Sequence, residues 1–231
     1  MTKLYTDTSA NLPLALLREY DIAVIPFSYT VNGVAEDYSE ETDFDGKAFY
    51  DAMRRGAEVK TSMVNPATAA AFFERALAQG DDVLYVTYAA SLGEGLQVLE
   101  AAELLRAGRG FEEVGDRILA RRPHMCQFFT VDDLNYLKRG GRISGAAALV
   151  GSVLGIKPIL RGDETGHIVS CGKVRGNKKA YAELADYFDK RALDKTARIG
   201  IAHADNREGT DYLLGLLRER GFTGECLEVY Y

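Results

Sequence analysis

The chain has 231 residues, 47% hydrophobic and 27% charged, which is ordinary for a globular protein that can bury a core without disulfide bonds or a structural metal. Its formal net charge of -6 argues against nucleic-acid binding, and no apolar run is long enough for a membrane-spanning helix. Three separated cysteines, three separated histidines and a start without the apolar stretch of a signal peptide predict a soluble, cytoplasmic protein without a metal or other cofactor.

The first 122 residues predict strands that alternate with helices, the pattern of parallel βαβ units. Residues 3–6 and 83–86 read as short strands, and residues 22–31 predict one longer strand that ends in an Asn-Gly turn. The helices are predicted over residues 14–20, 44–55, 66–80, 96–107 and 111–121.

Residues 123–231 predict a mixed α/β domain, because a hairpin with its turn at residues 162–166 interrupts the alternation. The fold class is therefore α/β with two domains, residues 1–122 and 123–231. Strands are predicted over 127–129, 156–160, 167–174, 198–202 and 225–231, and helices over 132–139, 146–154, 177–193 and 208–220.

Two groups of hydroxyl side chains stand where α/β proteins bind ligands. Thr61 and Ser62 come shortly before the helix that begins at Asn65-Pro66, where free N–H groups and the positive end of the helix dipole would suit a carboxylate or a phosphate. Asp7-Thr8-Ser9 follows the first strand, at the sheet edge that commonly binds ligands. From these residues alone, ordinary capping and loop chemistry is the slightly favoured explanation of both groups.

Other polar motifs carry weaker signals. Gly93-Glu94-Gly95 lacks the pattern of a phosphate-binding loop and is better read as a loop or a helix entry. The basic residues 138–142 and 173–175 could face an acidic partner, or could complement helix ends and lie in solvent. His203 next to Asp205 favours a structural role, and the sequence contains no recognisable catalytic set.

The order of several motifs resembles the DegV family, whose members share the EDD fold. The most specific is Leu134-Asn135-Tyr136-Leu137-Lys138-Arg139-Gly140-Gly141-Arg142-Ile143. It stands among more modest matches that run through nearly the whole chain, at residues 7–13, 25–26, 60–62, 91–96, 156–160 and 173–175.

This resemblance implies two α/β domains that hold one long-chain fatty acid, such as palmitate, in an apolar tunnel. The carboxylate would lie near Thr61 and Ser62, and Ser91 and Arg175 would complete the ligand-binding set. Some members of the family present the fatty acid to a fatty acid kinase, and Arg175 would lie near the head group or that partner. By the same resemblance the protein is a lipid-binding carrier and not an enzyme.

The sequence departs from the family pattern in two places. After Tyr88 the family usually has a Ser-Ser-x-Leu-Ser-Gly-Thr loop, a helix and a strand, whereas residues 89–95 here resemble the segment that follows that strand. A family segment with a His and a Gly-Pro-Gly would follow Tyr231.

Two other functions remain open at this stage. One is a phosphotransferase-like enzyme related to the dihydroxyacetone kinases, and the other is a divergent interaction module that does not bind lipid.

Overall fold

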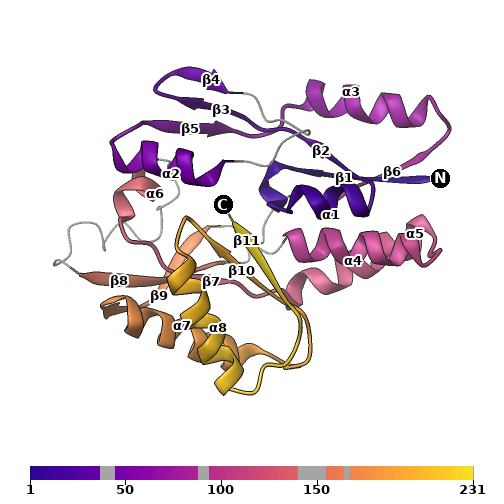
Figure 1. The fold of residues 1–231 in the computed structure, drawn as a ribbon. Coiled ribbons are helices and arrows are strands. Elements are labelled where there is room, and N and C mark those ends of the chain that lie inside the picture. Colours follow the sequence, from indigo (N-terminus) through magenta and orange to yellow (C-terminus); the bar gives the residue numbers. More distant parts are fainter. Residues whose placement is uncertain (37–44, 88–93, 140–154, 164–166, 231) are drawn as a thin grey trace.

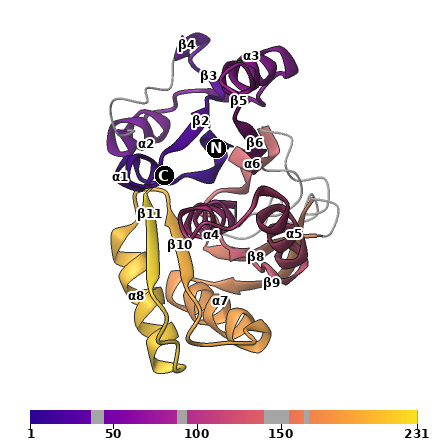
Figure 2. The same cartoon turned by 90° about the vertical axis from the view of Figure 1, so that its right-hand side faces the viewer.

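The computed structural model describes residues 1–36, 45–87, 94–139, 155–163 and 167–230, and their strands form four small sheets surrounded by helices (Figure 1). The α/β class that the sequence predicts is confirmed. The elements before residue 122 lie together in one part of the molecule, and most of the later ones lie in another (Figures 1 and 2).

The first sheet is parallel, with β1 (Thr2–Asp7) between β2 (Ile22–Ile25) and β6 (Asp82–Tyr85). Alternate side chains of β1 enter two cores, because neighbouring residues of a strand point to opposite faces. Leu4 packs with α1 (Leu14–Glu19), α4 (Glu94–Arg106) and α5 (Phe111–Arg121). Tyr5 packs against α3 (Pro66–Leu77) on the opposite face.

Residues 22–31, predicted as one strand, form two. β2 ends at Ile25, and β3 (Ser28–Val31) belongs to a second, antiparallel sheet between β4 (Val34–Glu36) and β5 (Val59–Ser62). Pro26 has no N–H to give to a ladder, and the N–H of Phe27 donates to Thr8 Oγ1 at 3.0 Å instead. The Asn32-Gly33 turn is confirmed, with positive φ angles of 52° and 80°.

The C-terminal part has two sheets. β7 (Phe128–Phe129), β8 (Ile156–Gly162) and β9 (Ile168–Arg175) form an antiparallel sheet, as the predicted hairpin requires. β10 (Ile199–His203) and β11 (Cys226–Tyr230) run parallel. The helices here are α6 (Leu134–Arg139), α7 (Asn177–Arg191) and α8 (Arg207–Glu219), and the predicted helix 146–154 lies outside the described residues.

Three further elements complete the described chain, namely the 3-10 helices η1 (Thr8–Ala10) and η2 (Arg122–His124) and the helix α2 (Gly46–Arg54). Asn65 caps α3 as expected, because its side chain accepts from Thr68 N at 2.8 Å.

Strand β11 joins the two parts of the molecule. Leu227 packs against the core cluster around Leu4, whose buried members all precede residue 122. Beside it, Arg198 donates to Glu103 of α4 at 2.8 Å. The hydrophobic core clusters of the C-terminal part contain only residues numbered above 127. Apart from Leu227, no core cluster of the described residues therefore combines residues from both sides of the expected boundary at residue 122. The domain boundary itself stays a prediction.

Candidate ligand-binding cavity

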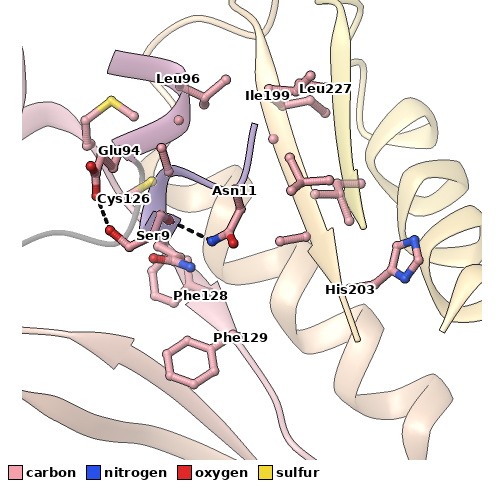
Figure 3. A pocket seen from close by; sticks show the side chains of 18 of the residues that line it. Ser9, Asn11, Glu94, Leu96, Cys126, Phe128, Phe129, Ile199, His203 and Leu227 are labelled. Carbon is pink, nitrogen blue, oxygen red and sulfur yellow. Dashed lines mark hydrogen bonds between the residues drawn. The ribbon is translucent and has the colours of Figure 1, made fainter. Parts of the chain in front are cut away.

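A cavity of about 1720 Å³ lies between these two parts (Figure 3). Its volume exceeds the roughly 300–1,000 Å³ of typical small-molecule pockets, so it has room for a long ligand. Elements from both parts contribute apolar side chains to its wall, among them Leu96, Phe128, Phe129, Ile201, Leu213 and Val229.

Strand β10, in which large and small residues alternate, forms one section of the cavity wall. Ile199 and Ile201 are buried and belong to the core beneath α7 and α8, Gly200 and Ala202 are more exposed, and all four residues line the cavity. A Cβ at Gly200 would meet the side chain of Leu96 at 3.6 Å. Leu96 of α4 therefore lies close to β10 at Gly200.

A buried polar cluster forms another section of the wall, at the carboxyl end of β1. Asp7 is 2% exposed and Glu94, the first residue of α4, is 3% exposed. The hydroxyl of Ser9 lies 2.5 Å from Asp7 Oδ1 and 2.8 Å from Glu94 Oε2. Figure 3 shows Ser9 and Glu94 facing each other beside the cavity.

Burial changes the titration of two members of this cluster. The pKa of Glu94 rises to about 7, first because burial disfavours its charged form and then because Asp7 lies nearby. The pKa of Tyr85, whose hydroxyl donates to Asp7 at 3.1 Å, rises to about 12, mainly through burial. Glu94 therefore titrates near neutral pH inside the cavity wall.

The sequence anticipated only part of this arrangement. Asp7 does cap η1, since its carboxylate accepts from Ser9 N at 2.9 Å, and Glu94 does start a helix. Their meeting could not be read from the sequence, because 87 positions separate them.

Thr61 and Ser62 lie within β5 rather than in a loop, and both are exposed. The Ser62 hydroxyl is 2.8 Å from that of Ser28 on β3. The two residues that follow, Met63 and Val64, line the cavity. Thr61 and Ser62 therefore directly precede two cavity-lining residues in the sequence.

A second, smaller pocket of about 300 Å³ lies beside these hydroxyls. It is lined by Ser28 and by Asn65 and Thr68 at the start of α3. Phe27, Met63 and Val64 line both this pocket and the large cavity. The two spaces are therefore neighbours, and the smaller one has the more polar wall.

The remaining predicted site residues are spread out. Arg175 ends β9, opposite Ile156, and is exposed. Ser91 lies outside the described residues. His203 has a structural position, as expected: its Nε2 lies 3.1 Å from Glu228 Oε1, and its Nδ1 accepts from Asn206 N at 3.2 Å. Asp205 forms an ion pair with Arg54 of α2 at 2.5 Å.

Two further polar atoms in the cavity wall are buried without a hydrogen-bond partner, Gln127 Oε1 and Thr130 Oγ1. A ligand or ordered water would satisfy them. Burial also raises the pKa of each cysteine thiol, including that of Cys126 in the same wall.

Within the described residues, no group of three or more His, Cys, Asp or Glu side chains is arranged to hold a metal ion. No helix of that part of the chain is long and apolar enough to cross a bilayer.

Helices packed on a parallel sheet, joined to a second α/β part across a large, partly apolar cavity, define a ligand-binding α/β protein. The profile of the family described as "Uncharacterised protein, DegV family" matches residues 1–92 and 87–230. The chain belongs to the DegV family. The two matched pieces overlap at residues 87–92, where the sequence departs from the family pattern.

Individual relatives in sequence and in structure are also DegV proteins. A DegV domain-containing protein of Clostridium perfringens is 30% identical, over 94% of this chain and 86% of its own length. A structure from Thermus thermophilus, described as fatty acid binding of a DegV family protein, has a TM-score of 0.82 at 27% identity and covers 99% of this chain and 92% of that one. A fatty acid binding DegV family protein from Streptococcus agalactiae has a TM-score of 0.85 at 27% identity, covering 100% and 92%.

Proposed function

We propose that this chain binds a long-chain fatty acid in the large cavity and acts as a carrier rather than as a catalyst. The cavity is the observation that carries the proposal, because its size and its apolar wall suit an extended acyl chain. The fatty-acid-binding relatives from Thermus thermophilus and Streptococcus agalactiae support it.

The energetics of such a site are favourable. At about 0.8 kcal/mol per buried CH₂, a tail of roughly 15 methylenes gives a gross gain near 12 kcal/mol. Immobilising the ligand offsets part of this gain, by an estimated 4 kcal/mol or more. The remainder favours tight binding with slow release, which is what a carrier requires.

The cavity wall offers a direct test through Ala202, an exposed cavity-lining residue of β10. Ala202→Trp places a large side chain in the cavity, so we expect palmitate binding to weaken at least about tenfold, because a bulky group displaces the ligand from a packed site. Ala35→Trp is the matched control, since Ala35 is an exposed alanine of strand β4.

Binding is measured by titrating delipidated protein with a fluorescent fatty acid and displacing it with palmitate. Equal affinities for the two variants and the unchanged chain would contradict the location of the site.

We further propose that the carboxylate of the fatty acid lies in the smaller pocket, near Thr61 and Ser62. Hydroxyl groups and the N-terminus of α3, a helix of 12 residues, would provide donors and a positive dipole end for it there. The exposed Arg175 would face a partner, such as a fatty acid kinase, that receives the ligand.

Thr61→Val tests the head-group position because it removes a hydroxyl and keeps the shape of the side chain. Losing one hydrogen bond to a charged group costs about 1.5 kcal/mol, so we expect roughly tenfold weaker palmitate binding. Thr223→Val, at an exposed position before β11, should leave binding unchanged. Thr61→Val should weaken the binding of a long-chain alcohol less than it weakens the binding of palmitate. A larger loss of affinity for the alcohol than for palmitate would contradict the proposal.

A further inference from the structure

The number of hydrogen atoms in the cluster around Ser9 decides whether its two carboxyl groups, those of Asp7 and Glu94, can both be ionised. Ser9 has one hydroxyl hydrogen, yet its Oγ lies within hydrogen-bonding distance of carboxylate oxygens of both Asp7 and Glu94. Two ionised carboxylates could not both receive that hydrogen. Both contacts are hydrogen bonds only if one of the two carboxyl groups is protonated and donates to Ser9.

The other contacts assign this proton to Glu94. Asp7 accepts from three further donors, namely Ser9 N at 2.9 Å, Tyr85 OH at 3.1 Å and Thr87 Oγ1 at 2.5 Å. With these donors the oxygens of Asp7 have hydrogen-bond partners without a proton on Asp7 itself. Glu94 accepts from Thr6 Oγ1 at 2.9 Å, and its second oxygen faces Ser9. With a proton on Glu94, two consecutive hydrogen bonds form: Glu94 donates to Ser9, and Ser9 donates to Asp7.

The titratable and polar groups around Glu94 come from several elements. β1 contributes Thr6 and Asp7, η1 contributes Ser9, and Tyr85 lies beyond Asp7 at the end of β6. Cys126 lines the same cavity, and like Tyr85 it has a pKa raised by burial, so both stay uncharged at neutral pH. The pKa of Glu94, at about 7, agrees with the proton that the hydroxyl geometry requires.

We infer that the cavity takes up an acyl chain in the form of the protein in which Glu94 is protonated, so that lipid binding is linked to uptake of a proton by Glu94. The inference rests on the proposed function. An acyl chain against this wall displaces water and makes a charge on Glu94 more costly. Rising pH therefore favours release of the ligand.

The test measures affinity of the full chain from about pH 6 to about pH 8.5, on either side of the Glu94 titration. The ligand is 1-hexadecanol, whose head group does not ionise in this range, so that only the protein titrates. Glu94→Gln keeps the shape and stays neutral at every pH. Glu112→Gln is the matched control, because Glu112 is an exposed glutamate in the first turn of helix α5.

We expect the affinity of the unchanged chain and of Glu112→Gln to fall by up to about tenfold per pH unit above the pKa of Glu94. The affinity of Glu94→Gln should stay level. Binding that is equally level, or that falls equally, in the unchanged chain and in Glu94→Gln would overturn the inference and leave the proposed function intact. Absence of 1-hexadecanol binding to the unchanged chain at every pH would overturn the inference, and absence of palmitate binding as well would overturn the proposed function.

A second measurement does not depend on the variant folding. A ¹³C NMR titration of the glutamate carboxyl groups in the unchanged, lipid-free chain should show one group with a midpoint near 7, moving upward when 1-hexadecanol is added. A Glu94 midpoint near its ordinary value, or one that the ligand does not move, would overturn the inference.

Discussion

At the scale of single residues, the burial of Glu94 links its protonation to the stability of the fold. The pKa of Glu94 is raised in the folded chain from an ordinary value of 4.5 to about 7, so the folded state holds this proton more tightly than the unfolded state does. The corresponding stability is complete below about pH 4.5 and is lost as the pH rises towards 7.

Glu94→Gln should therefore stabilise the protein above neutral pH, by up to about 3 kcal/mol for this shift. The gain should disappear at low pH, where Glu94 is protonated in both states. Denaturant unfolding at several pH values measures it. A difference between the two chains that does not change with pH would contradict the assignment of the proton.

Gly95 explains how α4 can approach η1 so closely. A Cβ at this position would lie 2.6 Å from the carbonyl oxygen of Ala10, which is backbone and cannot move aside easily. Gly95→Ala should destabilise the fold by about 1–3 kcal/mol, as overpacking does. Gly115→Ala in α5 is the matched control: nothing lies within 4 Å of its added Cβ, and alanine favours a helix by about 1 kcal/mol. Two changes of the same sign in thermal unfolding would contradict this account.

At the scale of elements, α2 contacts both the loop between β10 and α8 and the helix α6 beside the cavity. Arg54 pairs with Asp205 at 2.5 Å, and Tyr136 donates to the Met53 carbonyl at 3.2 Å. Arg54, Met53 and Tyr136 all line the cavity. The contact is exposed, so its contribution to global stability is small and weakens with salt.

Arg54→Ala should accelerate the release of bound lipid severalfold while leaving the unfolding temperature nearly unchanged. The adjacent and exposed Arg55 provides the control variant Arg55→Ala. Release is followed by transfer of a fluorescent fatty acid to lipid vesicles at low and high salt. If both variants release lipid at the rate of the unchanged chain, the ion pair has no role in retaining the ligand.

The elements also show where sequence reasoning succeeds. Helices with strong local signals, such as the Asn65-Pro66 start of α3, were predicted close to their observed bounds. Residues 22–31 were predicted wrongly as one strand because β-branched residues continue past Pro26, and the break depends on a hydrogen bond from Phe27 to Thr8. The cluster of Asp7, Ser9 and Glu94 was missed for the same reason, since residues far apart in the chain create it. The predicted ligand residues Thr61, Ser62, Ser91 and Arg175 stay predictions.

At the scale of the whole molecule, β11 couples the two parts. Leu227 of β11 packs on the core around Leu4 and also lines the cavity. Leu227→Ala should lower the free energy of unfolding by about 2 kcal/mol, at the lower end for a leucine that is only partly buried. Leu119→Ala, at a position 64% exposed, should cost less than about 0.5 kcal/mol.

Calorimetry should then show one transition for the unchanged chain, with equal calorimetric and van 't Hoff enthalpies. Two separate transitions would show that the parts unfold independently and that Leu227 does not couple them.

The most direct test of fatty-acid binding is mass spectrometry of an organic extract of the purified, unchanged chain, with native mass spectrometry of the same sample for stoichiometry. The account predicts one long-chain fatty acid per chain, either retained from the expression host or taken up after incubation with palmitate, and little in Ala202→Trp. A chain that contains no fatty acid and takes up none would contradict the proposed function.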